Sequence, residues 1–87
     1  MNKNERVKKL IYRSWHRGCK ETDLLLGEFA KVHLPSYTDQ ELDIYEKLAA
    51  VDDVDLYNWI SGVAQVPANY DTPIFRAIVA AHDSGSI

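Results

Sequence analysis

Apolar residues recur along the chain every three or four positions, which is the spacing of one face of an α-helix. Five segments show this spacing, and they predict helices over about residues 4–17, 20–33, 38–50, 52–63 and 73–82. No stretch alternates apolar and polar residues for long, so β-strands are not indicated. Because the breaks between the segments are brief, the pattern predicts an all-α fold, a compact five-helix bundle.

Each predicted helix carries one stripe of side chains that we expect to face the core. Gly27 interrupts the second stripe and indicates either close packing or a bend. The expected inward residues are Val7, Leu10, Ile11 and Trp15 in the first helix, Leu24, Leu25, Phe29 and Val32 in the second, Leu42, Tyr45, Leu48 and Ala49 in the third, Leu56, Trp59, Ile60 and Val63 in the fourth, and Ile74, Phe75, Ile78 and Val79 in the fifth.

Several helix boundaries are marked by residues with a specific capping role. Gly18 follows the first helix, where a left-handed backbone conformation is needed. Thr38 and Glu41 have the spacing of a capping box, in which each side chain accepts from the other residue's backbone N–H. Thr72 followed by Pro73 is typical of a helix start.

The length of 87 residues predicts one small domain over residues 1–87, with a loose tail at about residues 83–87. No apolar run approaches the ~18 residues that a membrane span needs, so no membrane insertion is expected. The N-terminal segment lacks the apolar core of a signal peptide and is not typical of a transit peptide. A single cysteine excludes an internal disulfide and suits a reducing compartment.

The net charge of −3 hides a strong asymmetry along the chain. Residues 1–20 hold seven of the ten Lys and Arg residues and one acid, whereas residues 21–87 hold three bases and twelve acids. A basic segment of this kind is found in nucleic-acid arms and in membrane-surface helices. The favoured interpretation is simpler: a basic first helix packs beside acidic helices of the same bundle.

No pattern of catalytic residues emerges from the chain. The four glycines form no nucleotide-binding loop, and the cysteine and three histidines lack the spacing of metal ligands. Cys19 stands at a helix start beside Lys20, which favours a reactive thiol, but no base or second cysteine accompanies it. We therefore predict a protein that is not an enzyme, with no catalytic residue and no metal site, which acts by binding another protein.

Two stretches look like contact surface, "RGCKETD" at residues 17–23 and "DDVDLYNWI" at residues 52–60. Each also has a purely structural interpretation. Arg17 and Glu21 suit the dipoles of the helices on either side of the turn and can pair across it. Trp59 would ordinarily be buried, with its indole N–H hydrogen-bonded.

Taken together, the two stretches resemble the R-G-x-x-E-x-D and D-D-x-D-L-[FY]-N-W-[LI] patterns of the flavinylation factors of succinate dehydrogenase, also called FAD assembly factors. The segments "YRSWHRG" and "SYTDQELDIYEKLAAVDD", which lead into the two patterns, are also similar to that family. The resemblance spans roughly residues 6–62. Either pattern alone is weakly specific, but both in this order and at this spacing are fairly specific.

The resemblance implies a chaperone-like assembly factor. Members of the family bind the flavoprotein subunit of succinate dehydrogenase, and in some bacteria that of fumarate reductase, and promote covalent attachment of FAD to a histidine of that subunit. FAD is then held by the partner, and we expect this chain to bind no cofactor stably. The family is cytoplasmic in bacteria and lies in the mitochondrial matrix in eukaryotes. We expect the chain to be a monomer.

The resemblance also assigns residues to partner contact. In the family, the R-G-x-x-E turn touches the flavoprotein near the flavin, which implies roles for Arg17, Gly18 and Glu21. Arg17 is expected to offer its planar fork to an acceptor on the partner, and Gly18 to let the partner's surface approach closely. The second-rank candidates for partner binding are Asp23, Asp52, Asp53, Asp55, Asn58 and Trp59.

Three alternatives remain open on the sequence. A nucleic-acid binder would use the basic first helix, but the acidic remainder of the chain would repel a phosphate backbone, so we expect no nucleic-acid partner. A regulatory, antitoxin-like module that binds a small membrane protein is described for some relatives and would use the same kind of surface. An enzyme would have to rely on Cys19.

Overall fold

The computed structural model describes residues 2–85 and confirms the all-α prediction. Its five α-helices are α1 (Lys3–Trp15), α2 (Lys20–His33), α3 (Asp39–Ala49), α4 (Asp53–Ser61) and α5 (Pro73–Asp83). Short 3₁₀ turns follow α2 (Leu34–Ser36) and precede α5 (Ala68–Tyr70). No strand occurs within the described residues.

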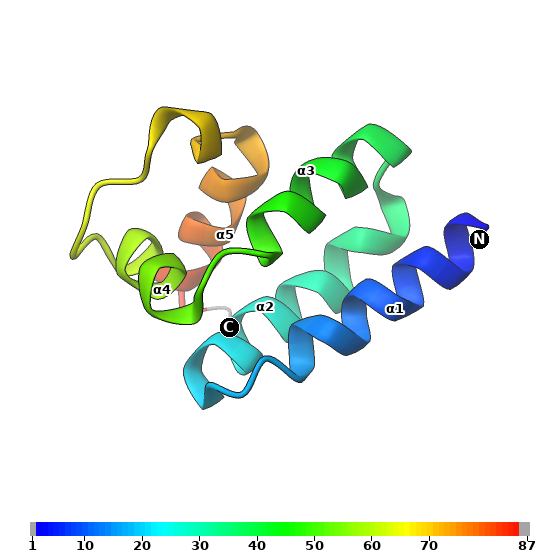
Figure 1. Cartoon of the computed structure of the whole chain (residues 1–87), viewed down its shortest axis with the longest axis horizontal. Helices are drawn as coiled ribbons and strands as arrows, with labels where there is room; N and C mark the ends of the chain where they lie inside the picture. The colour runs from blue at the N-terminus through cyan, green and yellow to red at the C-terminus, as the bar shows by residue number, and fades with distance from the viewer. Residues whose placement is uncertain (1, 86–87) are drawn as a thin grey trace.

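The helices form two groups that share one core (Figure 1). α1 and α2 run side by side in opposite directions, and α3 lies beside this pair and contacts α1. α4 and α5 pack together at the end of the molecule where the α1–α2 turn lies, and α5 also contacts α2 and α3. This arrangement brings the start of α4 next to the turn between α1 and α2.

The core draws apolar side chains from all five helices. Most of the predicted inward residues are buried, and the partly buried ones include Ile11, Trp59 and Val79. The fully or nearly fully buried set is Val7, Leu10, Leu25, Leu26, Phe29, Ala30, Leu34, Leu42, Tyr45, Leu48, Leu56, Ile60, Ile74, Phe75 and Ile78.

Three of the predicted core positions are wrong. Leu24 is 48% exposed and Val32 is 66% exposed, because the buried face of α2 is rotated toward Leu26 and Ala30. Because residues 24–26 are all leucine, the sequence does not indicate which of the three face the core. Val63 is 77% exposed because α4 ends at Ser61, before the stripe reaches it.

Gly27 marks close packing, one of the two interpretations left open by the sequence. A β-carbon at this position would lie 2.3 Å from Cδ2 of the Trp15 indole. Real β-carbons essentially never approach a neighbour that closely. The absence of a side chain therefore lets α1 and α2 come together at the end of the pair nearest the turn.

The capping predictions for α3 and α5 agree with the observed helix starts, whereas Gly18 lies two residues beyond the cap of α1 instead of directly past the helix. The Thr38 hydroxyl accepts from the Glu41 N–H, and the Glu41 carboxylate accepts from the Thr38 N–H, so the capping box is complete. Thr72 caps α5 through the Phe75 N–H. α1 ends at Trp15, two residues earlier than expected, which places Arg17 beyond the helix.

The predicted loose tail at residues 83–87 falls partly outside the described residues. Within residues 2–85, α5 continues to Asp83, and the Ser84 N–H donates to the Ala80 carbonyl. Residues 86 and 87 are not described. None of the helices over residues 2–85 combines the length and the apolar character required to cross a membrane.

Candidate partner-binding site

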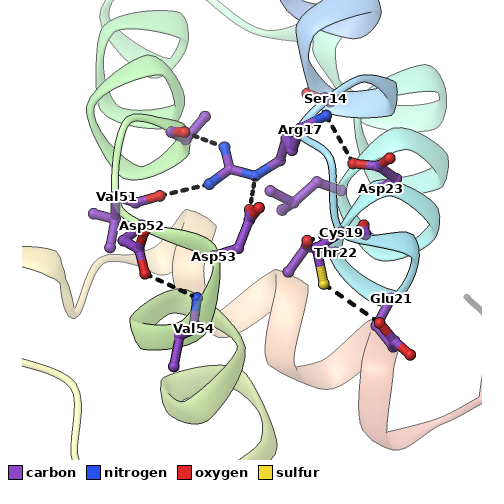
Figure 2. A network of polar contacts seen from close by, with 12 residues as sticks. Ser14, Arg17, Cys19, Glu21, Thr22, Asp23, Val51, Asp52, Asp53 and Val54 are labelled. Atoms are coloured by element: carbon purple, nitrogen blue, oxygen red, sulfur yellow. Dashed lines mark hydrogen bonds and ion pairs between the residues drawn. The ribbon is translucent and has the colours of Figure 1, made fainter.

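Arg17 joins the two stretches that the sequence singled out (Figure 2). Its Nε donates to Oδ1 of Asp53 at 2.5 Å, and its two terminal nitrogens donate to the carbonyl oxygens of Ala49 and Val51. The side chain is only 11% exposed. The guanidinium therefore ties the α1–α2 turn to the α3–α4 connection and to the first residue of α4.

Asp23 holds the same turn from the other side. Its Oδ1 accepts from the backbone N–H of Arg17 at 2.8 Å, six residues back along the chain. Arg17 is thus anchored through both its backbone and its side chain. The pairing of Arg17 with Glu21 that the sequence allowed is replaced by the pairing with Asp53, and the fork expected to face a partner is occupied by acceptors of this chain.

Gly18 occupies the middle of the turn with a backbone φ of +100°. L-residues rarely adopt this conformation, because a β-carbon would crowd the backbone. Apart from its two neighbours in the chain, no described residue has an atom within 4 Å of the position that a β-carbon would take, so the space outside the turn is open to the rest of residues 2–85. Gly18 therefore has a conformational reason to be glycine, and its outer side is free for another molecule.

Glu21 lies in the first turn of α2 and is exposed. Its own backbone N–H, the Cys19 thiol and the nearby Lys20 hold the pKa of its carboxyl below the usual value. The thiol donates to Oε2 at 3.3 Å. No cation within residues 2–85 forms a salt bridge with this carboxylate, so it stays ionised and available to an outside donor.

The candidate acids of the second stretch differ in their roles. Asp52 caps α4, because its Oδ2 accepts from the Val54 N–H at 3.2 Å. Asp53 is the partner of Arg17 and is half-buried. Asp55 is exposed, and its carboxylate forms no hydrogen bond or ion pair in the part of the chain that the structure describes.

The two remaining candidates lie on α4 and are half-buried. The Asn58 side chain forms no hydrogen bond within the described residues and borders a hollow beside the turn. Trp59 packs against Tyr70, with ring centroids 5.3 Å apart, so it supports the α4–α5 connection. Trp59 thus packs within the fold, but it is only half-buried and its indole N–H forms no hydrogen bond within the described residues, in contrast to the structural interpretation.

A hollow of about 390 Å³ lies between the α1–α2 turn and the outer face of α4. Val54 and Tyr57 line it, although the sequence reasoning did not select them. The sequence does contain an indication that Val54 is exposed, because this apolar residue stands among three aspartates at a helix start. Within residues 2–85, the hollow is lined by Cys19, Glu21, Asp53, Val54, Tyr57 and Asn58.

This surface combines apolar area, carboxylates and one amide, a mixture typical of protein–protein contacts. In the described chain, no group of three His, Cys, Asp or Glu side chains is placed to hold a metal ion. Glu21 and Asn58 line this hollow, and Gly18 lies in the turn that leads to Glu21. Arg17, Asp23 and Asp53 hold the turn against the start of α4 (Figure 2).

Comparison with known proteins shows which sequences this chain resembles. A family model described as "Flavinator of succinate dehydrogenase" matches residues 8–82. The chain is 39% identical over 71 residues to succinate dehydrogenase assembly factor 2, mitochondrial, of Dictyostelium discoideum, which covers 82% of this chain and 50% of that protein. It is 45% identical over 67 residues to the protein of the same name from Meyerozyma guilliermondii, which covers 76% of this chain and 45% of that protein.

A third relative, succinate dehydrogenase assembly factor 2-B, mitochondrial, of Drosophila mojavensis, is 37% identical over 75 residues, or 84% of this chain and 48% of that protein. The chain thus spans about half the length of the curated relatives it matches. The matched region includes the α1–α2 turn, α4 and the hollow between them.

Proposed function

The chain belongs to the family of flavinators of succinate dehydrogenase, and on this basis we propose that it binds the flavoprotein subunit of that enzyme and promotes covalent attachment of FAD to it. The family match over residues 8–82 carries the proposal. The flavoprotein of fumarate reductase, where the organism has one, is a second expected target of the same kind.

The surface around the α1–α2 turn supports this proposal. It offers an ionised carboxylate at Glu21, an open approach above Gly18 and a hollow beside α4. Arg17 contributes by fixing the two halves of the surface relative to one another, rather than by reaching outward. A rigid contact surface is what a protein needs when it stabilises one arrangement of its partner.

We expect the chain to act by orientation and not by catalysis. Covalent attachment of FAD is a reaction of the cofactor and of the flavoprotein that holds it. A helper that holds the reacting groups in a productive geometry can lower the barrier by several kcal/mol, up to roughly 7–11 kcal/mol. No step of this mechanism requires a nucleophile or a base from this chain.

FAD suits the partner better than it suits this hollow. Two carboxylates, Glu21 and Asp53, line the hollow, and they would repel the pyrophosphate of the dinucleotide. We therefore propose that the chain, as a monomer, acts on FAD held by the flavoprotein. Its site of action is the compartment of that subunit, which is the cytoplasm in a bacterium and the mitochondrial matrix in a eukaryote.

In-gel flavin fluorescence of the flavoprotein subunit tests the proposal. The subunit is expressed with FAD and a dicarboxylate, alone, with the wild-type chain, or with Glu21→Ala. We expect strong covalent fluorescence only with the wild-type chain. Glu21→Ala should fold normally, because the Glu21 side chain is exposed and caps no other element.

Equal fluorescence in all three samples would contradict the proposed function. Fluorescence with both the wild type and Glu21→Ala, but not in the subunit alone, would keep the function and remove Glu21 from the contact. Circular dichroism of Glu21→Ala separates loss of contact from loss of fold.

A further inference from the structure

We propose that the hollow between the α1–α2 turn and α4 receives a cationic side chain, lysine or arginine, of the flavoprotein. This inference rests on the proposed function and names the chemistry of the partner group that enters the site. The hollow contains about 390 Å³, enough room for one long side chain. The apolar surface and the charges that surround the hollow both favour such an occupant.

The apolar part of the hollow suits the aliphatic stem of a long basic side chain. Val54 is 66% exposed, although it is apolar and stands in the first turn of a helix. Tyr57 follows it by three residues, on the same face of α4, and adds part of an aromatic ring to the lining. Lysine and arginine bury such stems on apolar surface while their charged heads remain among polar groups.

The polar part of the hollow favours a positive head group. Glu21 is ionised and forms no ion pair within residues 2–85, and Asn58 offers an amide oxygen with no internal donor. Asp55 does not line the hollow, but it follows Val54 on α4 and adds an exposed carboxylate with no partner within residues 2–85. Arg17 offsets only Asp53, and no cationic side chain of residues 2–85 lines the hollow.

The helix dipoles do not reverse this preference. The N-termini of α2 and α4 both lie at the hollow, and each contributes roughly half a positive charge. The acidic residues of the two first turns are Glu21 and Asp23 in α2 and Asp53 and Asp55 in α4. Counted as whole charges, these four carboxylates slightly exceed the two half-charges of the dipoles together with Arg17 and Lys20. Among them, Glu21 lines the hollow and has no ion pair within residues 2–85, so it is the group that favours a cationic head.

A pair of substitutions with opposite charges tests the sign of the occupant. Val54→Lys and Val54→Glu both replace the valine by a longer, flexible side chain, and they differ in the sign of its charge. Binding to the purified flavoprotein is measured by biolayer interferometry. We expect Val54→Lys to weaken binding about tenfold or more, and Val54→Glu to weaken it about threefold or less, because only lysine repels a cationic occupant.

Val32 provides the matched control pair. It is also a helical valine that is 66% exposed, but it lies eleven residues beyond Glu21 along α2, about 16 Å away. Val32→Lys and Val32→Glu should both bind like the wild type. Thermal unfolding of all four variants verifies that each is folded at the temperature of the measurement.

A photo-crosslinking amino acid at position 54 identifies the occupant directly and does not depend on the stability of the charged variants. Peptide mapping should place the crosslink in a flavoprotein segment that contains lysine or arginine. Replacement of that residue by methionine should weaken binding of the wild-type chain and should abolish the difference between Val54→Lys and Val54→Glu.

The outcomes distinguish failure of the proposed function from failure of the inference on the hollow. If the wild-type chain does not bind the flavoprotein, the proposed function fails and this inference fails with it. If the wild type binds while Val54→Lys and Val54→Glu bind equally, or if the crosslink falls on a segment without a basic residue, only the inference on the hollow is overturned.

Discussion

Arg17 shows how a residue that looks like a contact residue in the sequence can act within the fold. Its guanidinium binds one carboxylate and two backbone carbonyls from the α3–α4 region. Charge-assisted hydrogen bonds of this kind are the strong ones, and their loss would leave Asp53 without its counter-ion. We infer that an arginine is needed here because a planar fork can satisfy three acceptors at once.

Replacement of Arg17 should therefore lower the stability of the fold, and any loss of partner binding should follow from that loss of stability. We expect Arg17→Ala to reduce the free energy of unfolding by about 2–4 kcal/mol, and Arg17→Lys to recover less than half of the loss. Urea denaturation followed by circular dichroism measures both. Arg76→Lys is the control, because Arg76 forms an exposed pair with Asp71 and should change stability by less than about 1 kcal/mol.

Gly18 has two separable roles, one in the backbone and one at the surface. Gly18→Ala and Gly18→Arg should each destabilise the fold by about 1–2 kcal/mol, because any β-carbon is strained at a φ of +100°. Since the surrounding space is open, the longer side chain adds little further cost.

Partner binding should distinguish the two Gly18 variants. Gly18→Ala keeps most of the binding to the flavoprotein, whereas Gly18→Arg blocks the approach and abolishes it. Equal binding by both variants would mean that the turn does not face the partner. A much greater loss of stability in Gly18→Arg than in Gly18→Ala would mean that the space is not open in solution.

At the scale of the elements, the turn owes its position to the close packing of α1 on α2. Trp15 ends α1, and its indole lies over Gly27 of α2. The two helices can approach in this way only because Gly27 has no side chain. The contact fixes the end of the helix pair from which the Arg17–Gly18 turn leaves.

Gly27→Ala should disturb this packing although alanine is the better helix former. We expect a net loss of about 1–3 kcal/mol in the free energy of unfolding. The added methyl group must displace the indole, and the cost of that displacement exceeds the gain in helix propensity from glycine to alanine. Thermal unfolding measures the effect. In a Trp15→Leu background the same substitution should cost much less, and additive losses would contradict the assigned contact.

At the scale of the whole molecule, ion pairs between helices neutralise part of the basic charge of the N-terminal segment. Arg6 of α1 pairs with Asp43 and Glu46 of α3, and Arg13 pairs with Glu46. The basic first helix thus lies beside an acidic one, as the favoured interpretation of the sequence held. These internal pairs weaken the case for a nucleic-acid partner of α1.

Tyr45 lies where α1, α2 and α3 meet, and it links the stability of the whole bundle to pH. Its hydroxyl shares a hydrogen bond with Ser14 Oγ at 2.6 Å, and burial raises its pKa to about 12. The neutral hydroxyl is therefore favoured in the folded state. Its contribution is complete below about pH 10, where an unfolded tyrosine begins to ionise, and is lost as the pH rises to about 12.

We expect the wild type to lose about 2–3 kcal/mol of stability between pH 10 and pH 12 through this residue. Tyr45→Phe should be less stable at neutral pH by about 1 kcal/mol, but flatter over the alkaline range. Urea midpoints at a series of pH values measure the difference. Tyr12→Phe, at an exposed position, should keep the wild-type slope, and an equally steep profile for Tyr45→Phe would exclude Tyr45 as the cause.

The sequence by itself determined the helices, most of their caps, most of the core and the family. These features rest on local periodicity, on capping residues a few positions apart and on two short motifs, and each of them can be recognised along the chain. The family suspected on the motifs "RGCKETD" and "DDVDLYNWI" is confirmed by the match over residues 8–82.

Only the tertiary structure decided which face of α2 is buried, that Gly27 accommodates Trp15, and that Arg17 joins Asp53 across 36 residues. It also decided that Val54 and Tyr57 border a hollow beside Glu21. These features depend on how separate helices approach one another. The apolar face of a helix predicts that the helix will pack against another element. The position and angle at which it packs depend on the neighbouring helix and on the side chains between the two.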